Sequence, residues 1–482
     1  MEREVGMFMK KKLAVLLTVT LLAACAAGCG STAEEKKETN TTAAQESVSE
    51  ASTDEGDKTK AAESDVELTF SAWAGATEKA VLEEALAGFT DATGIKVKGI
   101  FIPDDYETKI STMIASGTAP DVGYLVAPTA HDWYADGQIM DLTPLMEEDS
   151  SFKKEDLLDA AYSYYDDEAI DALLLSLQTY AVFYNKDLFE KAGVPEPSAD
   201  KVWTWDEFVE TAKKLTFDSN GNSALDADFD AGNIQQYGVY INPKGPTIVE
   251  PLLVRNTSVG YTDKDGTEYG LKNPEAVDFL QKLADLINVE HASPSTTTAQ
   301  GLPSADLSLQ TGKYAMVVDS QYMLSNFAKL ESLNLGLAPL PSNGNNTILT
   351  SSGCKVIFSQ TKYPEEAWEL MKWLSDPAES LELYSSGLWM PIKSDWYTDE
   401  SKVEQWAGEG KSHPSGYKEV FLNPVWENSE LSSEHRMKHY NQINDIVFPA
   451  LDKVWTGEQT VQDALDKVMP EVDKIFDGVF GQ

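Results

Sequence analysis

Cysteine and positive charge are both scarce in this chain of 482 residues. Of its three cysteines, only Cys354 lies beyond the first thirty positions. A disulfide framework is therefore excluded for the body of the protein, and we expect Cys354 to be a core thiol. The 38 lysines and arginines are outnumbered by 79 acidic residues, which gives a formal net charge of −41. This balance argues against nucleic acid and anionic lipid as partners, because both attract basic side chains.

Long hydrophobic runs are also missing. A membrane-spanning helix needs about 20 consecutive apolar residues, and no stretch approaches that length. The apolar run at 13–22 is short, follows three lysines at 10–12, and leads into small residues around Cys25 and Cys29. A basic start, a short apolar run and small residues are typical of a secretory signal peptide.

The cysteines at the end of this leader indicate a lipid anchor. Leu22, Ala23 and Ala24 precede Cys25 and resemble the bacterial lipobox, whose cysteine receives a diacylglycerol. Cys29 fits the same pattern less strictly, and a plain cleaved signal with incidental cysteines is the alternative. We therefore interpret residues 1–29 as a lipoprotein signal peptide and lipobox, with Met1 or Met9 as the start.

The segment that follows the leader is poor in large apolar side chains. Residues 30–65 are mostly Ser, Thr, Ala, Glu, Lys and Asp. Such a segment cannot bury enough surface to offset its ordering entropy, so it predicts a disordered tether. Lipid and tether together would hold the protein at the outer face of the cytoplasmic membrane, on the extracellular side.

Most motifs of catalysis and metal binding are absent. The sequence has no nucleophile elbow, no phosphate-binding loop and no HExxH. We expect no cofactor and no metal site, and any ATP hydrolysis belongs to a separate subunit. The acidic stretch 218–230 is interpreted as an exposed Asx-turn loop, with calcium as the alternative, because it lacks the EF-hand spacing. His435 and His439 are four apart on an expected helix, where a solvated face is favoured.

Alternating and helical patterns follow one another in the first third of the body. They predict strands at 66–71, 95–100 and 121–126, separated by helices at 77–93 and 106–116. Thr77 is the expected cap of the first helix, and Gly94 ends it. This order points to a mostly parallel α/β sheet.

Helix-start signals recur in the second half. Thr204 and Glu207 form a capping box, and Pro274 and Pro364 each open a stretch with one apolar face. A last amphipathic helix covers 461–476, where Pro470 is expected to kink or split it.

Several local patterns occur in an order that resembles a known family. They are TGIKV at 93–97, GTAPDV at 117–122, DGQIMDLT at 136–143, FYNKDLF at 183–189, WTWDEF at 203–208, GKYAM at 312–316 and LAPLP at 337–341. In this order they resemble extracellular solute-binding proteins of family 1, the carbohydrate-binding lipoproteins of ABC importers. The resemblance covers nearly everything from Leu68 onward.

The resemblance implies a type 2 periplasmic-binding-protein-like fold. Two discontinuous α/β lobes would be joined by a multi-strand hinge. The N-terminal lobe would comprise 66–177 plus 350–386, and the C-terminal lobe 178–349 plus 387–482. The implied protein is a monomer and not an enzyme: it captures a sugar or oligosaccharide between the lobes and delivers it to membrane permease subunits.

A sugar site needs flat apolar surfaces for C–H faces and a few aimed polar groups for hydroxyls. Positions at strand ends and at the expected crossings between lobes supply both. The candidates are Trp73, Tyr124, Gln178, Tyr180, Asp319, Tyr322 and Trp389. For each of them the alternative is a purely structural role in the core. Trp203, Trp205, Trp368 and Trp373 are expected to be structural.

Other functions remain open at this stage. A lipid-anchored carbohydrate-active enzyme, such as a glycosidase or lyase, would share the aromatic and acidic residues and the surface address. An adhesin or sensor on the same scaffold is a third possibility. The sequence does not identify the sugar, and polyols and phosphorylated glycerols are not excluded.

Overall fold

The computed structural model describes residues 64–166, 168–199, 201–410 and 412–481. These residues fall within one compact unit, Lys58–Gln482. The predicted signal peptide, both lipobox cysteines and nearly all of the predicted tether lie outside the described residues. None of the helices in the described part is long and apolar enough to cross a bilayer.

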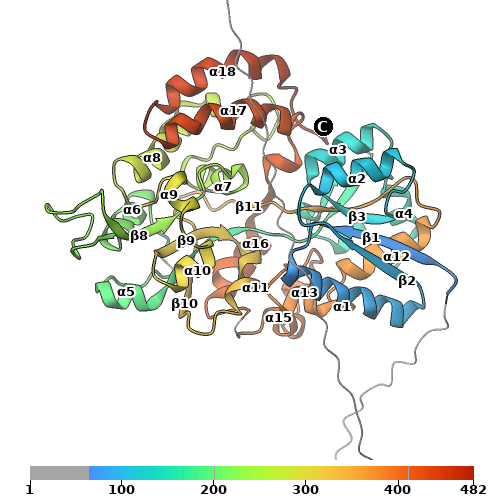
Figure 1. The fold of residues 1–482 in the computed structure, drawn as a ribbon. Coiled ribbons are helices and arrows are strands. Elements are labelled where there is room, and N and C mark those ends of the chain that lie inside the picture. Colours follow the sequence, from blue (N-terminus) through green and yellow to red (C-terminus); the bar gives the residue numbers. More distant parts are fainter. Residues whose placement is uncertain (1–63, 167, 200, 411, 482) are drawn as a thin grey trace, which may run out of the picture. The chain divides into compact units, whose positions relative to one another are not determined.

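The first sheet has six strands, and its order is not the order of the chain (Figure 1). From one edge to the other the strands are β2 (Lys96–Phe101), β1 (Glu67–Ala72), β3 (Val122–Leu125), β12 (Cys354–Ile357), β5 (Ile170–Leu174) and β4 (Tyr162–Tyr164). β1 is parallel to β2 and β3, whereas β12 and β4 run antiparallel to their neighbours. The expectation of a mostly parallel sheet was therefore wrong, because β12 enters from a distant part of the chain in the opposite direction.

Helices pack against this sheet. They are α1 (Ala76–Thr93), α2 (Tyr106–Ala115), α3 (Ala127–Ala135), α4 (Thr143–Glu148), α12 (Pro364–Ser375) and α13 (Leu381–Ser385), with short 3₁₀ turns η1 (Lys154–Asp156) and η2 (Asp159–Ala161). Gly94 ends α1 in the left-handed conformation, as predicted. The cap prediction was wrong: Gly75 precedes the helix, and Thr77 already lies in its first turn.

The second sheet has five strands. Their order is β10 (Leu335–Ala338), β6 (Tyr180–Asn185), β9 (Tyr314–Ser320), β8 (Ile234–Tyr240) and β7 (Phe217–Asp218), with only β8 and β9 parallel. The helices and 3₁₀ turns of this part are α5 (Lys186–Ala192), α6 (Trp205–Lys214), α7 (Pro246–Thr257), η3 (Gly270–Lys272), α8 (Pro274–Asn288), α9 (Thr296–Gln300), α10 (Ala305–Gln310), η4 (Gln321–Met323), α11 (Leu324–Phe327), α17 (Tyr440–Trp455) and α18 (Val461–Ile475).

The helix starts predicted in the second half of the sequence are present, but the helix break predicted at Pro470 is not. The capping box of Thr204 and Glu207 is present at the start of α6, as predicted. The proline-initiated helices at Pro274 and Pro364 are also confirmed. Pro470 does not split α18, which remains one helix from Val461 to Ile475.

The chain passes between the two sheets through segments that lie side by side. The Leu175 amide donates to the Gly353 carbonyl at 2.8 Å, and the Ser351 amide donates to the Gln178 carbonyl at 3.0 Å. β11 (Ile348–Thr350), in the second passage, pairs with β13 (Ser429–Leu431). The remaining elements here are α14 (Asp395–Thr398), α15 (Glu400–Ala407), the π-helical turn η5 (Lys418–Leu422), α16 (Asn423–Asn428) and the 3₁₀ turn η6 (Ser433–His435).

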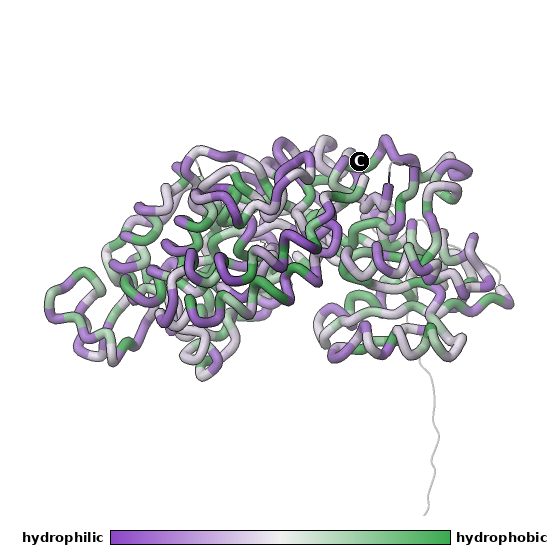
Figure 2. Tube along the Cα trace, turned by 90° about the horizontal axis from the view of Figure 1, so that it is seen from above, coloured by the Kyte–Doolittle hydropathy of each residue, from purple (hydrophilic) through white to green (hydrophobic). Residues whose placement is uncertain are grey.

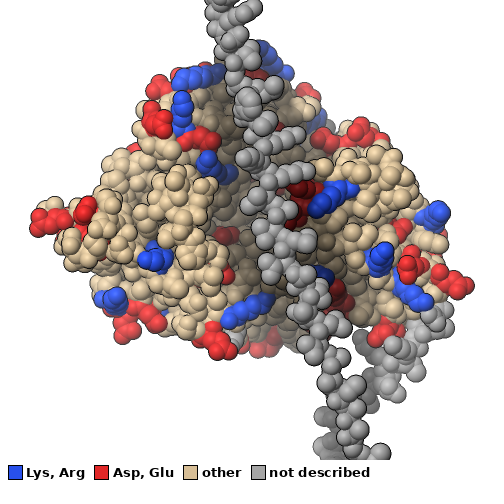
Figure 3. Space-filling model, in the orientation of Figure 1, with Lys and Arg blue, Asp and Glu red and all other residues tan. Residues whose placement is uncertain are grey.

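Two hydrophobic clusters stabilise these elements. One joins the first sheet and its helices to residues of segment 388–425 and to one face of the second sheet. The other joins the second sheet to α8, α17 and α18. Figure 2 shows apolar and polar stretches interspersed along the trace, and Figure 3 shows acidic and basic side chains scattered over the visible face. Cys354, Trp205 and Trp368 are buried in these clusters, as expected.

Candidate functional site

Three of the predicted residues meet near the carboxyl end of β1. Trp73, just after that strand, packs edge-on against Tyr124, with ring centroids 5.2 Å apart. Trp389 lies on the other side of Tyr124 at 6.3 Å. Tyr124 and Trp389 are buried, whereas Trp73 is half-buried. Trp73 therefore offers the free surface of this aromatic cluster, and the other two rings support it.

A glycine of the second passage lets Trp73 lie where it does. A Cβ atom at Gly353 would meet the Trp73 ring at 2.6 Å, closer than real contacts allow. The absence of a side chain at Gly353 thus brings the aromatic ring against the passage between the sheets.

Two further predicted residues lie at the end of β9 of the second sheet and just after it. Tyr322, in η4, is 39% exposed, and Asp319 is half-buried at the end of the strand. The Asp319 carboxylate accepts the Ser320 amide at 2.7 Å. Burial raises the Asp319 pKa to about 6, because water no longer solvates the charged form.

Glu78 was not among the site residues predicted from the sequence. Its charge acts on Tyr124 of the aromatic cluster and on Tyr322. It lies half-buried in the first turn of α1. Burial, together with the charges of Asp319, Asp306 and Glu78, raises the pKa of Tyr322 to about 12. Burial also raises the pKa of Tyr124, and Glu78 adds to that shift. Its carboxylate therefore lies near a tyrosine of each sheet.

The Glu78 carboxyl itself lacks a compensating partner in the described part of the chain. Burial raises its pKa to about 7. Its sequence position carried a usable signal, because helices that follow parallel strands begin at the edge of the sheet where ligands bind.

Two lysines near these residues, Lys355 and Lys329, form hydrogen bonds within the protein. Lys355 is buried, with Nζ 5.0 Å from the Trp389 ring centre, and it donates to the Leu174 carbonyl at 2.9 Å. Burial lowers the Lys355 pKa to about 7. Lys329, which follows α11, donates to Thr77 Oγ1. Lys355 thus lies beneath the aromatic cluster rather than free beside it.

The remaining two predicted residues lie in the first passage, apart from the aromatic cluster. Gln178 is half-buried and binds Ser351 through its backbone carbonyl. Tyr180 is also half-buried, and burial raises the pKa of its hydroxyl. The charge of Asp319 also acts on Tyr180, so this residue borders the β9 side of the site.

One arrangement in the described residues has the composition of a catalytic triad. Ser163 Oγ lies 3.3 Å from His131 Nε2, and His131 Nδ1 lies 2.7 Å from Asp171 Oδ2. All three side chains are buried, and Phe480 stacks on the imidazole at 3.9 Å. No solute can reach the serine, so the cluster stabilises the packing of the C-terminal segment.

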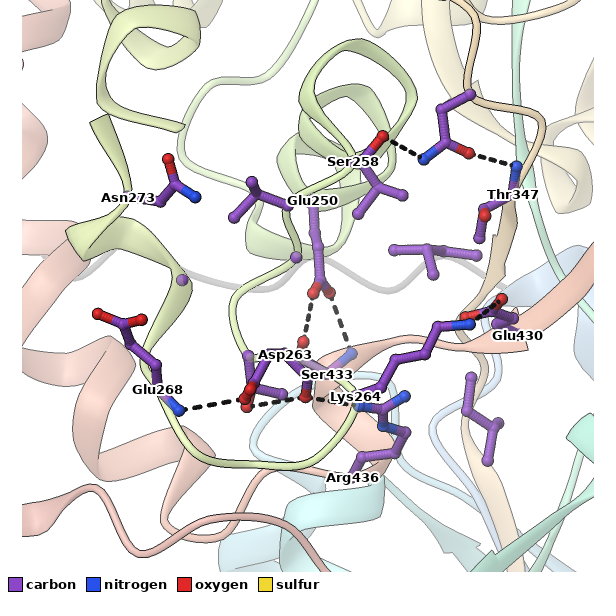
Figure 4. A pocket seen from close by; sticks show the side chains of 18 residues that line it. Glu250, Ser258, Asp263, Lys264, Glu268, Asn273, Thr347, Glu430, Ser433 and Arg436 are labelled. Carbon is purple, nitrogen blue, oxygen red and sulfur yellow. Dashed lines mark hydrogen bonds and ion pairs between the residues drawn. The ribbon is translucent and has the colours of Figure 1, made fainter. Parts of the chain in front are cut away.

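A polar cavity of about 430 Å³ opens elsewhere, between α7 and the β11–β13 pair (Figure 4). Some of its charged groups are already hydrogen-bonded or paired. Glu250 accepts the Ser433 amide at 3.1 Å, and Lys264 donates to Glu430 at 2.8 Å. It contains none of the predicted site residues.

Other predicted sites resolve into local structure. Asp218 is buried and accepts the amides of Asn220, Asn222 and Asp230, so its oxygens serve the Asx-turn loop. Among the residues with described placement, no group of three or more His, Cys, Asp or Glu could hold a metal ion. The solvated helix face predicted for His435 and His439 was wrong: His435 is buried in η6 and accepts the Ser352 amide at 3.3 Å.

Comparison with known proteins identifies the family. Residues 73–380 match the bacterial extracellular solute-binding proteins. The chain belongs to this family. Among curated relatives, a putative binding protein of Brucella abortus is 24% identical over 355 residues, covering 70% of this chain and 80% of the relative. The sn-glycerol-3-phosphate-binding periplasmic protein UgpB of Agrobacterium fabrum is 24% identical over 366 residues, covering 70% and 75%.

Solved structures of binding proteins share the fold. The ABC substrate-binding protein Lmo0181 of Listeria monocytogenes, in complex with cycloalternan, aligns with a TM-score of 0.69 at 22% identity, covering 85% of this chain and 98% of that one. Maltose-bound MalE3 of T. maritima gives 0.67 at 23% identity, covering 85% and 99%. This protein is therefore a solute-binding protein with the open-sheet α/β fold of type 2 periplasmic binding proteins.

Proposed function

We propose that this protein binds a neutral sugar or oligosaccharide between its two sheets and delivers it to the permease subunits of an ABC importer. The observation that carries the proposal is the composition of the candidate site. An aromatic surface at Trp73 and Tyr322 is combined with carboxyl groups from both sides, Glu78 and Asp319, and free cations are lacking among the described residues that form it.

This composition suits a carbohydrate. The rings of Trp73 and Tyr322 can cover the C–H faces of a sugar, and carboxylates accept hydrogen bonds from its hydroxyls. Groups from both sheets would contact one ligand, so binding would favour the closed arrangement of the two lobes that the family resemblance implies. The solved relatives bound to maltose and cycloalternan are consistent with this assignment.

A phosphorylated glycerol fits the site less well, although curated relatives are named for that ligand. Phosphate recognition uses Arg or Lys in bidentate or charge-assisted hydrogen bonds. Here the Lys355 ammonium is buried against carbonyl oxygens, and the candidate residues include two carboxyl groups instead, those of Glu78 and Asp319. We therefore favour a neutral polyhydroxyl solute.

The proposal includes a lipid anchor and release of the ligand without chemical change. A diacylglycerol on Cys25 or Cys29 would keep the protein on the extracellular face of the membrane, beside its permease. The ligand would be released intact, because the buried Ser163–His131–Asp171 cluster cannot act on it. Replacing each cysteine by serine and following incorporation of labelled fatty acid would identify the anchor.

A ligand panel tests the binding proposal. Maltose, maltotriose and cycloalternan should raise the melting temperature of the protein, whereas sn-glycerol 3-phosphate should not. Calorimetry on Glu78→Gln should show weaker binding of the best sugar. The matched control is Glu83→Gln on the outer side of the same helix, where Glu83 pairs with Lys79 at 3.6 Å. Stabilisation by the phosphate alone, or fragments released from the sugar, would contradict the proposal.

A further inference from the structure

Arg255 is a buried cation whose charge is not neutralised by a neighbouring acid. It lies in the last turn of α7 and is only 6% exposed. Its Nη2 donates to the Leu340 carbonyl at 3.3 Å, while Nε has no hydrogen-bond partner. Within the described part of the chain, Arg255 forms no ion pair with a carboxylate.

A buried guanidinium without an opposite charge destabilises the folded state. Moving a charge out of water carries a penalty of several kcal/mol unless an opposite charge and hydrogen bonds compensate it. One carbonyl contact does not neutralise a guanidinium, and burial lowers the Arg255 pKa accordingly. None of the described residues supplies the opposite charge that would offset this penalty.

Arg255 lines a cavity that has room for such a partner. The cavity measures about 370 Å³ and lies between α7, strand β11 and α16. Thr179 and Tyr180 of the first passage form part of its wall, and Asn423 and Asn428 add amide groups at the rim. Volume, a guanidinium and neutral hydrogen-bonding groups are therefore present together.

The acidic residues at the rim of the cavity favour a ligand with a single negative charge. Glu419 and Glu427 also line the cavity, and both residues are exposed. Their negative charges oppose a multiply charged anion such as phosphate more strongly than a single charge. A carboxylate supplies one negative charge and two coplanar oxygens, which match the fork of an arginine.

We propose that this cavity is a second binding site, which takes a small organic monocarboxylate with its carboxylate on the Arg255 guanidinium. The cavity shares Tyr180 with the border of the proposed sugar site, but the aromatic residues Trp73, Tyr322 and Trp389 do not line it. The ligand's carboxylate provides the counter-charge that the fold leaves out, and its remaining atoms occupy the space beside β11.

The experiment measures binding of acetate, lactate and glucuronate to the full chain by thermal shift and calorimetry, with inorganic phosphate at equal ionic strength for comparison. We expect saturable stabilisation by at least one carboxylate and none by phosphate. Arg255→Met should weaken that binding about tenfold or more, since a charge-assisted hydrogen bond is lost. Arg255→Lys keeps the charge but loses the fork, so it should bind with intermediate affinity.

A second variant keeps the test decisive if Arg255→Met folds poorly. Glu427→Gln changes an exposed rim residue, and it should strengthen carboxylate binding and admit phosphate. The absence of any saturable carboxylate effect on the wild type would overturn the proposal. Equal carboxylate binding by a folded Arg255→Met would overturn it too. So would a loss of stability in ligand-free Glu427→Gln, because that result would identify Glu427 as the partner of Arg255.

Discussion

Replacing Tyr322 by alanine is expected to weaken sugar binding by about 2 kcal/mol. A tyrosine side chain offers about 200 Å² of contact surface. Because Tyr322 is 39% exposed in the free protein, roughly 80 Å² remains for a ligand to cover. At about 25 cal/mol per Å², covering that area contributes about 2 kcal/mol. This corresponds to about a thirtyfold change in Kd, which calorimetry with the best sugar of the panel would measure.

The same exposure predicts that the fold will tolerate the change. Surface substitutions usually shift the free energy of unfolding by no more than about 0.5 kcal/mol. Tyr363→Ala is the matched control: Tyr363 is 36% exposed, but it precedes α12, away from the site residues. Unchanged affinity in Tyr322→Ala, or an equal loss in Tyr363→Ala, would refute the assignment of Tyr322 to the site.

Three further predictions concern stability, measured by chemical denaturation. The native pKa of buried Glu434 is raised from 4.5 to about 7, so the native state retains a proton that the unfolded chain has lost, and stability falls as pH rises through this window. Glu434→Gln should remove that decrease and match the wild type below pH 4.5; parallel pH profiles would contradict this. Gly238→Ala should cost more than about 2 kcal/mol, because its Cβ would lie 1.8 Å from the Ala212 carbonyl oxygen, whereas Gly410→Ala, with open space around it, should be neutral. Thr204→Ala should cost about 1 kcal/mol by removing the N-cap of α6, while Thr204→Ser should retain stability; equal stability of both variants would argue against the capping box.

Local signals were reliable where their cause lies within one helical turn. The capping box at Thr204 and the left-handed glycine at Gly94 both satisfy backbone groups of their own helix, so neighbours in sequence suffice to specify them. The exception is instructive. Threonine is a favoured N-cap residue, but α1 begins before Thr77. Its N-cap is Gly75, where the chain leaves β1.

The candidate site was only partly predictable for a different reason. Aromatic residues at strand ends pointed to Trp73 and Tyr322, because strand ends meet at one edge of a sheet. Whether a ring is free or buried depends on what packs over it. Tyr124 and Trp389 are both buried in the structure, where Tyr124 packs against Trp73 and Trp389 packs against Tyr124, so their predicted contact with a ligand stays a prediction.

The sequence by itself determined the family, the α/β class, most helix limits and the scarcity of basic charge, since these depend on composition and on patterns a few residues long. Only the tertiary structure decided which polar groups are deprived of water. Glu78 looks like an ordinary first-turn acid and Arg255 an ordinary last-turn base. Each becomes a candidate ligand contact because segments far away in the chain bury it while no described residue supplies an opposite charge, and desolvation is a property of the packed fold.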